Sequence, residues 1–379
     1  MIIPLLILAY WLVKGLDFVI GILYGVPRLE KDKFSSAILN YPRVSIIFAA
    51  KDEAKRVGSA LRTFLAQDYP DFEVIAVNDR STDETLAILN SVKNPRLKVL
   101  DIQDLPSGWL GKTHALYEGY KISKGEWLLF TDADVHMDPL TLKTAVAAAE
   151  AQRLEHLTLF PKLVIHQYIE AVFTNYFAIL FNFRYRPWSA RFKRSLSYVG
   201  IGAFNMVRRE TYEGVGTHKR LALDIADDMM LGKIIKRCGA GQMAMFGDEF
   251  ISVRWVEGFA GVLHSLHKNA FRGLNYNYPF LALSTLMILG VDILPFAGLF
   301  FLKGAAFYFS AASVFCIFLV YLAGQKHSPR SLLTFFAHPF AALLFIFTLW
   351  RSAVSVLKEG GVRWRDTFYP VEDLRRSML

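Results

Sequence analysis

The sequence is poor in cysteine and in the patterns that mark nucleic-acid binding. Its 379 residues include only two cysteines, Cys238 and Cys316, so neither a disulfide framework nor a cysteine-based metal site is indicated. This fits a catalytic part that faces the cytosol. No zinc-finger, RRM or helix-turn-helix pattern is present. The net charge of +9 therefore favours attraction to an anionic bilayer surface, and we expect no nucleic-acid partner.

Apolar residues are abundant, and they are unevenly placed. Hydrophobic residues make up 53% of the chain, and 31 residues are phenylalanine. They concentrate in residues 2–26, near residues 165–190 and in most of residues 277–357, with an ordinary charged sequence between these segments. The distribution predicts one soluble domain combined with membrane elements.

Residues 2–26 have the character of an uncleaved membrane anchor. Lys14 and Asp17 interrupt the stretch, and it has no small-residue cleavage site. Three basic residues follow it: Arg28, Lys31 and Lys33. Under the positive-inside rule, they place the N-terminus outside and the following domain in the cytosol. We therefore predict an integral protein of the cell (inner) membrane whose catalytic domain faces the cytoplasm.

The C-terminal apolar block offers candidate spans at about 280–301, 304–323 and 333–353, each near the length that a bilayer requires. Three crossings after a cytosolic domain would leave the basic tail outside, against the positive-inside rule. The tail residues concerned are Lys358, Arg363, Arg365, Arg375 and Arg376. Asp292–Pro295 or His338–Pro339 could mark a re-entrant or interfacial segment, and the sequence leaves this open.

Residues 167–194 combine aromatic residues at helical spacing with a basic cluster. Phe173, Phe177 and Phe181 recur on one helical face, and the stretch 184–194 is rich in Arg and Lys. This pattern is typical of a helix that lies in the bilayer interface, which we predict at about 167–190. The alternative is a core helix of the soluble domain.

Strands and helices alternate in the charged part of the sequence. The expected strands are residues 43–50, 72–77, 97–100 and 127–130. Helices are expected at 56–67, from about 81 to about 89, and at 113–122. Ser81 and Glu84 have the spacing of a capping box that opens the second helix. This alternation predicts an α/β fold with a mostly parallel, Rossmann-like sheet.

Two carboxylates follow the strand at 127–130. Asp132 and Asp134 lie just beyond its carboxyl end, where open α/β sheets bind ligands. Both can turn toward one hard cation, Mg²⁺ or Mn²⁺, whose other positions remain for water and phosphate oxygens. A chance acidic pair is the alternative. A calcium loop is excluded, because Met137 and Lys143 stand where that loop needs Gly and Glu.

Other polar residues stand at comparable places. Asp52 and Glu53 follow the first strand, and Asp79 follows the second. Lys112 belongs to the stretch GWLGKT, which is not a Walker loop because Pro106 occupies the place of its first glycine. A lysine at a helix start can still meet a diphosphate.

Asp227 and Asp228 open a helix that continues to about Arg237. Acidic residues in a first helical turn stabilise the helix dipole whatever else they do. From the residues alone, this pair is as well explained by capping as by catalysis.

The motifs VSIIFAAKDE, VNDRSTDET, GWLGKTHAL, LLFTDADV and DIADDMMLG, in this order, resemble those of family 2 glycosyltransferases with the GT-A fold. The GWLGK variant, an anchor at each end and the tail GGVRWRDTFYP are similar to the lipid-modifying branch, which includes ceramide glucosyltransferase-like, hopanoid-biosynthesis and carotenoid-type enzymes. The resemblance implies a GT-A domain over residues 40–275 between an N-terminal anchor (1–27) and a C-terminal transmembrane block (277–357), followed by a basic tail (358–379).

The resemblance also implies roles for particular residues. Asp228 would be the catalytic base that removes the acceptor proton, and Asp227 would orient the donor or a loop. Asp132 and Asp134 would hold the metal ion. The residues that bind the nucleotide sugar would be Asp52, Glu53, Asp79, Lys112 and Asp132. Weaker candidates for contact with the acceptor or the diphosphate are His218, Lys268 and Arg272.

The implied reaction is inverting transfer of a single sugar from a UDP-sugar to a hydroxyl of a membrane lipid. UDP-glucose and UDP-N-acetylglucosamine are the expected donors. Processive members of the family carry a QxxRW motif, and the matching window here, HSLHKNAFRG, has no Arg-Trp pair, which disfavours a polysaccharide synthase. A non-catalytic membrane scaffold with a degenerate GT-A domain is the other alternative, and the complete acidic set argues against it.

Overall fold

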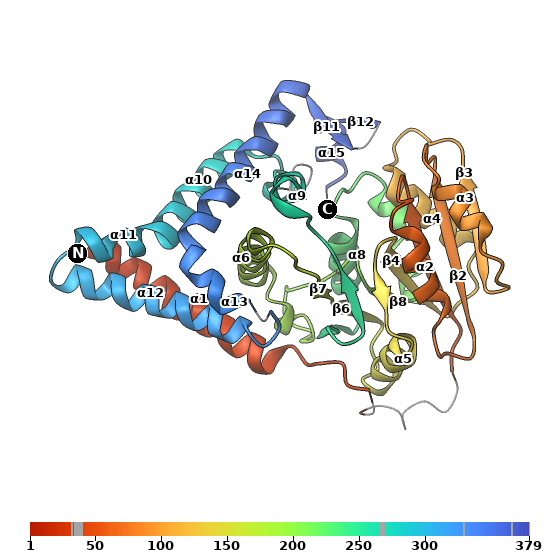
Figure 1. Ribbon diagram of the computed structural model, residues 1–379, viewed down its shortest axis with the longest axis horizontal. Helices are drawn as coiled ribbons and strands as arrows, with labels where there is room; N and C mark the ends of the chain where they lie inside the picture. Colours follow the sequence, from red (N-terminus) through yellow and green to blue (C-terminus); the bar gives the residue numbers. More distant parts are fainter. Residues whose placement is uncertain (32, 34–40, 266–269, 329, 365–366, 379) are drawn as a thin grey trace. The chain divides into compact units, whose positions relative to one another are not determined.

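The computed structural model describes residues 1–31, 33, 41–265, 270–328, 330–364 and 367–378 (Figure 1). The chain divides into two compact units. The sheet unit comprises Val26–Val164 and Pro187–Arg254. The helical unit comprises Met1–Gly25, Ile165–Arg186 and Trp255–Met378.

The sheet unit contains a seven-stranded sheet with the order β3-β2-β1-β4-β8-β6-β9. Its strands are β1 (Val44–Ala50), β2 (Phe72–Asp79), β3 (Leu97–Ile102), β4 (Trp127–Asp132), β6 (His156–Phe160), β8 (Asn205–Arg208) and β9 (Gln242–Phe246). β8 is antiparallel to β4 and β6, and all other neighbours are parallel. The predicted α/β fold with a mostly parallel sheet is therefore confirmed.

Continuous apolar runs explain the central strands. Ile46, Ile47 and Phe48 of β1, like Leu128 and Leu129 of β4, have no exposed surface. Neighbouring residues in a strand point to opposite faces, so these strands are covered on both sides. This is the pattern of a buried parallel sheet, and it is why the sequence located β1 and β4 correctly.

Helices accompany the strands in the sheet unit. They are α2 (Val57–Leu65), α3 (Thr85–Ser91), α4 (Gly111–Ile122), α5 (Thr141–Ala151), α7 (Arg209–Gly214) and α8 (Asp227–Arg237). α4 packs directly on β1 and β2, because a Cβ at Gly119 would lie 2.7 Å from Ile47 and 2.9 Å from Val77. A small second sheet joins β5 (His136–Met137), β10 (Ile251–Val253) and β7 (Lys162–Leu163).

The capping box predicted at Ser81 and Glu84 is wrong. α3 begins at Thr85, its N-cap residue Glu84 makes no side-chain cap, and Asp83 Oδ1 accepts the hydrogen bond from the Thr85 N–H at 2.9 Å. Ser81 Oγ instead accepts a hydrogen bond from the Asp52 N–H at 3.1 Å, and Asp52 Oδ1 accepts one from the Thr82 N–H at 2.7 Å. The loop after β2 is thus tied to the loop after β1, and this long-range pairing overrides the local spacing.

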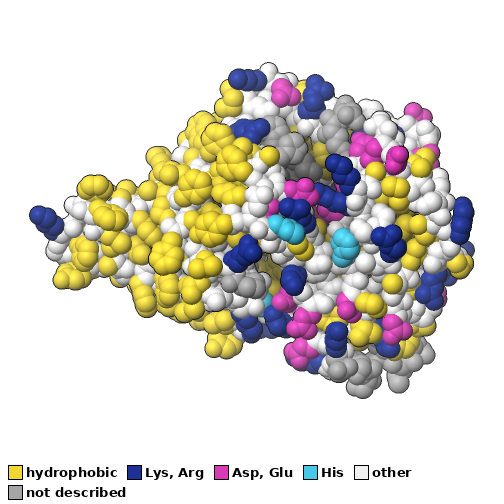
Figure 2. All heavy atoms as spheres, viewed as in Figure 1, with side chains coloured by type: hydrophobic (Ala, Val, Ile, Leu, Met, Phe, Trp, Pro, Cys, Tyr) yellow, Lys and Arg dark blue, Asp and Glu magenta, His cyan; other side chains and the backbone are white. Residues whose placement is uncertain are grey.

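Within the described residues, the helical unit contains four segments that are long and apolar enough to cross a membrane: Ile2–Gly25, Tyr278–Phe301, Ala305–Gly324 and Ser331–Glu359. Its elements are α1 (Ile2–Ile20), α6 (Tyr168–Tyr185), α9 (Gly258–Ser265), α10 (Tyr278–Ile288), α11 (Leu294–Phe301), α12 (Ala305–Gly324), α13 (Ser331–Thr334), α14 (His338–Glu359), β11 (Gly361–Trp364), β12 (Thr367–Pro370) and α15 (Val371–Arg376). Hydrophobic side chains cover much of the surface of these helices (Figure 2).

α6, the predicted interface helix, belongs to the helical unit. Ala171, Phe173 and Tyr176 are buried on it, and it packs against α13 and α14. Its C-terminal end is tied to α1, since the Arg186 guanidinium donates to the Asp17 carboxylate at 2.7 and 2.8 Å. α6 is therefore held along its length by other helices of this unit.

The helical unit also buries a polar network. Asp292 lies in a π-helical turn between α10 and α11 and is 3% exposed. The Tyr176 hydroxyl donates to its carboxylate at 3.0 Å, and His338 Nε2 lies 3.1 Å from it. The Tyr321 hydroxyl is 3.0 Å from His338 Nδ1. The network joins four helical elements that are far apart in the sequence.

Candidate active site

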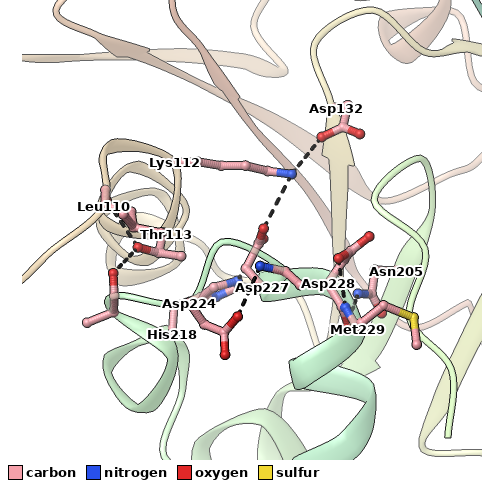
Figure 3. A network of polar contacts seen from close by, with 12 residues as sticks. Leu110, Lys112, Thr113, Asp132, Asn205, His218, Asp224, Asp227, Asp228 and Met229 are labelled. Carbon is pink, nitrogen blue, oxygen red and sulfur yellow. Dashed lines mark hydrogen bonds and ion pairs between the residues drawn. The ribbon is translucent and has the colours of Figure 1, made fainter. Parts of the chain in front are cut away.

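Lys112 and the acidic residues of two motifs meet at the carboxyl end of β4. Asp132 is the last residue of this strand, and Lys112 lies in the first turn of α4. Lys112 Nζ is 2.8 Å from Asp132 Oδ1 and 3.7 Å from Asp227 Oδ1 (Figure 3). The structure thus brings together three residues that the sequence singled out separately.

Lys112 is the positive centre of this group. Burial works to lower the pKa of Lys112, but Asp132, Asp227 and Asp228 together raise it well above its ordinary value. The ammonium group therefore stays charged, and it offsets only part of the negative charge of the three carboxylates around it. The Lys112 ammonium group could also form a charge-assisted hydrogen bond with a diphosphate bound in this site.

The two aspartates at the start of α8 differ in exposure. The Asp227 side chain is only 6% exposed, between Lys112 and His218. Asp228 is half-buried, and its Oδ1 accepts a hydrogen bond from the Met229 N–H at 2.7 Å. Burial raises the pKa of Asp228, and Lys112 opposes that shift. Asp228 is the more exposed residue of the pair, and both aspartates line a narrow pocket together with Lys112.

Gly202 separates the metal motif from the predicted base. A Cβ on this residue would lie 2.8 Å from Asp132 Oδ2 and 3.3 Å from Asp228 Oδ2. Both carboxylates therefore approach the same point, and only glycine leaves it free. Gly202 also donates a backbone hydrogen bond that favours the charged form of Asp228. The sequence analysis missed Gly202.

Two further glycines fix the segment that carries Gly202. A Cβ on Gly200 would overlap the Asp228 carbonyl, and one on Gly232 would overlap the Val199 carbonyl. The backbone of residues 199–200 therefore lies directly on α8. The two glycines in the sequence VGIGAF, just before β8, were the only signal of this close approach.

Asp134 lies in a strongly negative environment. Burial raises the pKa of Asp134 to about 6, helped by Asp132 and Glu53 and opposed by Arg56. Arg56 Nη1 is 3.3 Å from Asp134 Oδ2. Among the described residues, no group of three or more His, Cys, Asp or Glu side chains forms a metal site on its own. Two carboxylates with excess negative charge do fit a cation that takes its remaining ligands from water and phosphate.

The predicted nucleotide-binding residues lie at adjacent strand ends. Asp79 ends β2, is 4% exposed and accepts a hydrogen bond from Arg80 Nε at 2.8 Å. A Cβ on Gly111 would overlap the Asp79 carboxylate, so the start of α4 lies against it. Asp52 is engaged in the loop pairing with Thr82, as described above.

Two of the three weaker candidates lie in the described part of the chain. His218 is buried, its Nδ1 lies 2.6 Å from the Tyr212 hydroxyl, and its ring packs edge-on against Phe130. Burial, with Lys112 nearby, lowers the pKa of His218 to about 3, so the ring is neutral. Arg272 is buried in the helical unit, and Lys268 lies outside the described residues.

Comparisons with known proteins agree with this fold. Residues 45–216 match the sequence model of Glycosyl transferase family 2. The chain carries a family 2 glycosyltransferase domain. A 4,4'-diaponeurosporenoate glycosyltransferase of Staphylococcus aureus (strain USA300) is 25% identical over 356 residues, which are 91% of this chain and 92% of that protein. The glycosyltransferase activity and the family 2 resemblance predicted from the motifs are thereby confirmed.

A solved structure has the same fold. The mannosyltransferase PcManGT from Pyrobaculum calidifontis, in complex with GDP-Man and Mn²⁺, matches with a TM-score of 0.56 at 16% identity. The match covers 94% of this chain and 98% of that one. The sheet unit of this glycosyltransferase has the GT-A fold, and the chain adds helices that are apolar enough to cross a membrane.

Proposed function

We propose that this glycosyltransferase moves one sugar from a UDP-sugar, UDP-glucose or UDP-N-acetylglucosamine, to a membrane lipid with inversion at the anomeric carbon. The observation that carries the proposal is the meeting of Asp132 and Asp228 on either side of Gly202. The leaving diphosphate and the attacking acceptor must meet at one carbon, so their binding groups must converge. These two carboxylates converge in this way.

Asp132 and Asp134 would hold Mg²⁺ or Mn²⁺, and the related fold of PcManGT was solved with Mn²⁺. The cation would act as a Lewis acid on the leaving diphosphate. Lys112 would contribute a second positive charge to the same group. Asp52, Glu53 and Asp79 would line the pocket for the nucleoside at the ends of β1 and β2.

Asp228 would act as the base. It is half-buried and its pKa is raised by burial, so it can reach an acceptor hydroxyl and holds a proton better than an ordinary aspartate. Asp227 is enclosed between Lys112 and His218, which suits a positioning role. Neutral His218, held by the Tyr212 hydroxyl, would help to fix the position of Asp227 in the lining of the same pocket.

A lipid acceptor is supported by the relative that is named for diaponeurosporenoate and by the apolar helices. The ending of that name denotes a carboxylate, which would attack as an anion and form a glycosyl ester. A hydroxyl acceptor needs the base and forms a glycoside. Since Asp228 is placed as a base, the hydroxyl is our proposal, and the two products differ in their stability to mild alkali.

The arrangement of the helical unit suggests how the chain crosses the membrane. α1 and α12 run side by side in the same direction, with Gly15 close to Val320 (Figure 1). α14 starts beside Asp292, in the middle of the α10–α11 segment. It then returns along α10, where Trp350 Nε1 donates to the Thr285 hydroxyl at 3.0 Å.

We therefore propose that α1, α10–α11 and α12 cross the membrane and that α13–α14 is re-entrant. Three crossings after an outside N-terminus place the sheet unit and the basic tail together on the cytoplasmic side, as the positive-inside rule requires. In this arrangement residues 1–27 are the anchor, residues 277–357 the C-terminal membrane block and 358–379 the tail. Fluorescent-protein and alkaline phosphatase fusions after Leu379 test this, since a crossing α14 would export the phosphatase and activate it.

The function itself is tested with membranes from cells that express the protein. They are incubated with UDP-glucose, UDP-N-acetylglucosamine and GDP-mannose in turn, with Mn²⁺ or with EDTA. Mass spectrometry of the extracted lipids should show one hexose or N-acetylhexosamine added per lipid, only with metal, and absent from membranes without the protein. Long sugar polymers would instead favour a processive synthase, and no product with any donor would favour a scaffold.

A further inference from the structure

The sheet unit exposes a short loop in which basic and apolar side chains are mixed. Residues 191–196 read RFKRSL, and Arg191 to Arg194 are all exposed. Phe192 is 54% exposed and Leu196 is 93% exposed. The Arg191 guanidinium lies 4.9 Å from the centre of the Phe192 ring. Large apolar side chains flanked by cations are unfavourable in water but suit the headgroup region of a bilayer.

The loop is exposed, yet its ends are firmly held. Lys236 Nζ, on α8, donates to the backbone carbonyls of Ala190 at 2.6 Å and of Phe192 at 2.7 Å. On the other side, the Val199 N–H donates to Gln242 Oε1 at 3.0 Å. The backbone that carries Phe192 and Leu196 is therefore fixed by the sheet unit. The exposure of these two side chains is not explained by packing within the unit.

We propose that residues 191–196 dock the sheet unit onto the surface of an anionic bilayer. Phe192 and Leu196 enter the interfacial layer, while Arg191, Lys193 and Arg194 contact lipid phosphates. Charge complementarity favours this occupant, because phospholipid headgroups of anionic membranes attract clustered Lys and Arg side chains. The loop also starts five residues after Arg186, the last residue of the segment that belongs to the apolar helical unit.

Docking at this loop has a consequence for catalysis. Lys236 belongs to α8, whose first turn carries Asp228, and residues 199–200 lie on the backbone of that turn. A bilayer contact at residues 191–196 therefore sets the height of the proposed base above the lipid surface. The inference rests on the proposed membrane location but not on the transfer reaction.

The test measures lipid contact rather than product, so its result is separate from that of the proposed function. The full chain, with Cys238→Ser and Cys316→Ala, receives a single cysteine at Leu196 and an environment-sensitive fluorophore. It is reconstituted into vesicles of phosphatidylcholine alone or of phosphatidylcholine with phosphatidylglycerol. A matched protein carries the label at Asn90, an exposed position of α3 in the same unit.

We expect brominated phospholipids to quench the label at residue 196 and not the label at residue 90. Quenching should be stronger with phosphatidylglycerol and should fall in the triple variant Arg191→Gln, Lys193→Gln, Arg194→Gln. A triple variant at exposed lysines elsewhere in the sheet unit, Lys55→Gln, Lys93→Gln, Lys124→Gln, should quench like the parent.

Equal quenching at residues 196 and 90 in both kinds of vesicle would overturn the proposal. A second copy of the chain is the rival occupant. In that case the emission of the label at residue 196 would depend on the ratio of protein to lipid and not on phosphatidylglycerol. That result would also overturn the proposal.

Discussion

The two units of this protein surround their buried carboxylates with different kinds of side chain. In the sheet unit, Asp132, Asp227 and Asp228 surround one lysine, so negative charge is in excess. In the helical unit, the Asp292 carboxylate has a tyrosine donor and a histidine as close partners. Several carboxylates around one lysine point to a ligand site, whereas a carboxylate enclosed by a tyrosine and a histidine points to structure. The comparison therefore distinguishes a reactive site in the sheet unit from a structural hydrogen-bond network in the helical unit.

The largest effect is expected when the excess charge is removed from the sheet unit. Asp134→Ala should reduce transfer on the order of 10³-fold, because loss of a metal ligand removes several kcal/mol of transition-state stabilisation. Asp104→Ala, at an exposed carboxylate of the same unit, is the control and should transfer normally. Initial rates against Mn²⁺ concentration give the result. Unchanged metal dependence in Asp134→Ala would remove Asp134 from the metal site.

Gly202 offers the second test, because it affects geometry without changing charge. Gly202→Ala places a Cβ 2.8 Å from Asp132 Oδ2, so that carboxylate must shift. A displacement of about 1 Å can lower turnover about 10²-fold. Gly214→Ala is the matched control, since a Cβ there has no atom within 4 Å. If both variants turn over at the parental rate and melt at the same temperature, the close approach of Asp132 and Asp228 does not matter for catalysis.

In the helical unit, the same kind of change should affect stability and not chemistry. Asp292→Asn weakens the bonds to Tyr176 and His338 and should destabilise the unit by about 1–2 kcal/mol. Asp17→Asn breaks the more exposed ion pair with Arg186 and should matter less, about 0–1 kcal/mol. Thermal unfolding in detergent measures both.

Activity per folded molecule should stay at the parental value in both of these helical-unit variants. An Asp292→Asn protein that is stable but inactive would mean that the network takes part in acceptor binding. The distinction between the two units would then fail.

The sheet unit should also show a pH dependence of stability that the helical-unit variants leave unchanged. His156 is buried against Asn205 and Gln242, and burial lowers its pKa to about 4 from 6.5. Between these values the unfolded chain binds the extra proton, so stability falls as the pH falls, by about 1.4 kcal/mol per pH unit. His156→Gln should remove its share of this slope, leaving the share of buried His218, and His136→Gln, at an exposed histidine, should not change it. Melting temperatures from pH 7 to pH 5 provide the measurement.

The sequence was most informative where a local pattern determines the structure. Continuous apolar runs located β1 and β4, shorter apolar segments located β2 and β3, and the rule for parallel strands then placed Asp132 and Asp79 at the same edge of the sheet. The order of motifs supplied Asp228, which no periodicity identifies. These positions follow from neighbouring residues in the chain.

Long-range contacts could not be predicted in the same way. Gly202 matters because the segment before β8 lies on α8, and only the neighbouring Gly200 hints at that contact in the sequence. The Ser81 hydroxyl is used by Asp52 instead of by a helix start, so a correct local motif gave a wrong assignment. The burial of His218 against Tyr212 also depends on tertiary packing.

The central claim is that Asp228 removes the acceptor proton while the donor is held by other residues. The direct measurement compares UDP-sugar binding and lipid transfer for Asp228→Asn and the parent protein in the presence of Mn²⁺. The account predicts donor affinity close to that of the parent and transfer reduced by about 10²- to 10⁴-fold. Normal transfer by Asp228→Asn, with the donor bound as tightly as before, would contradict it.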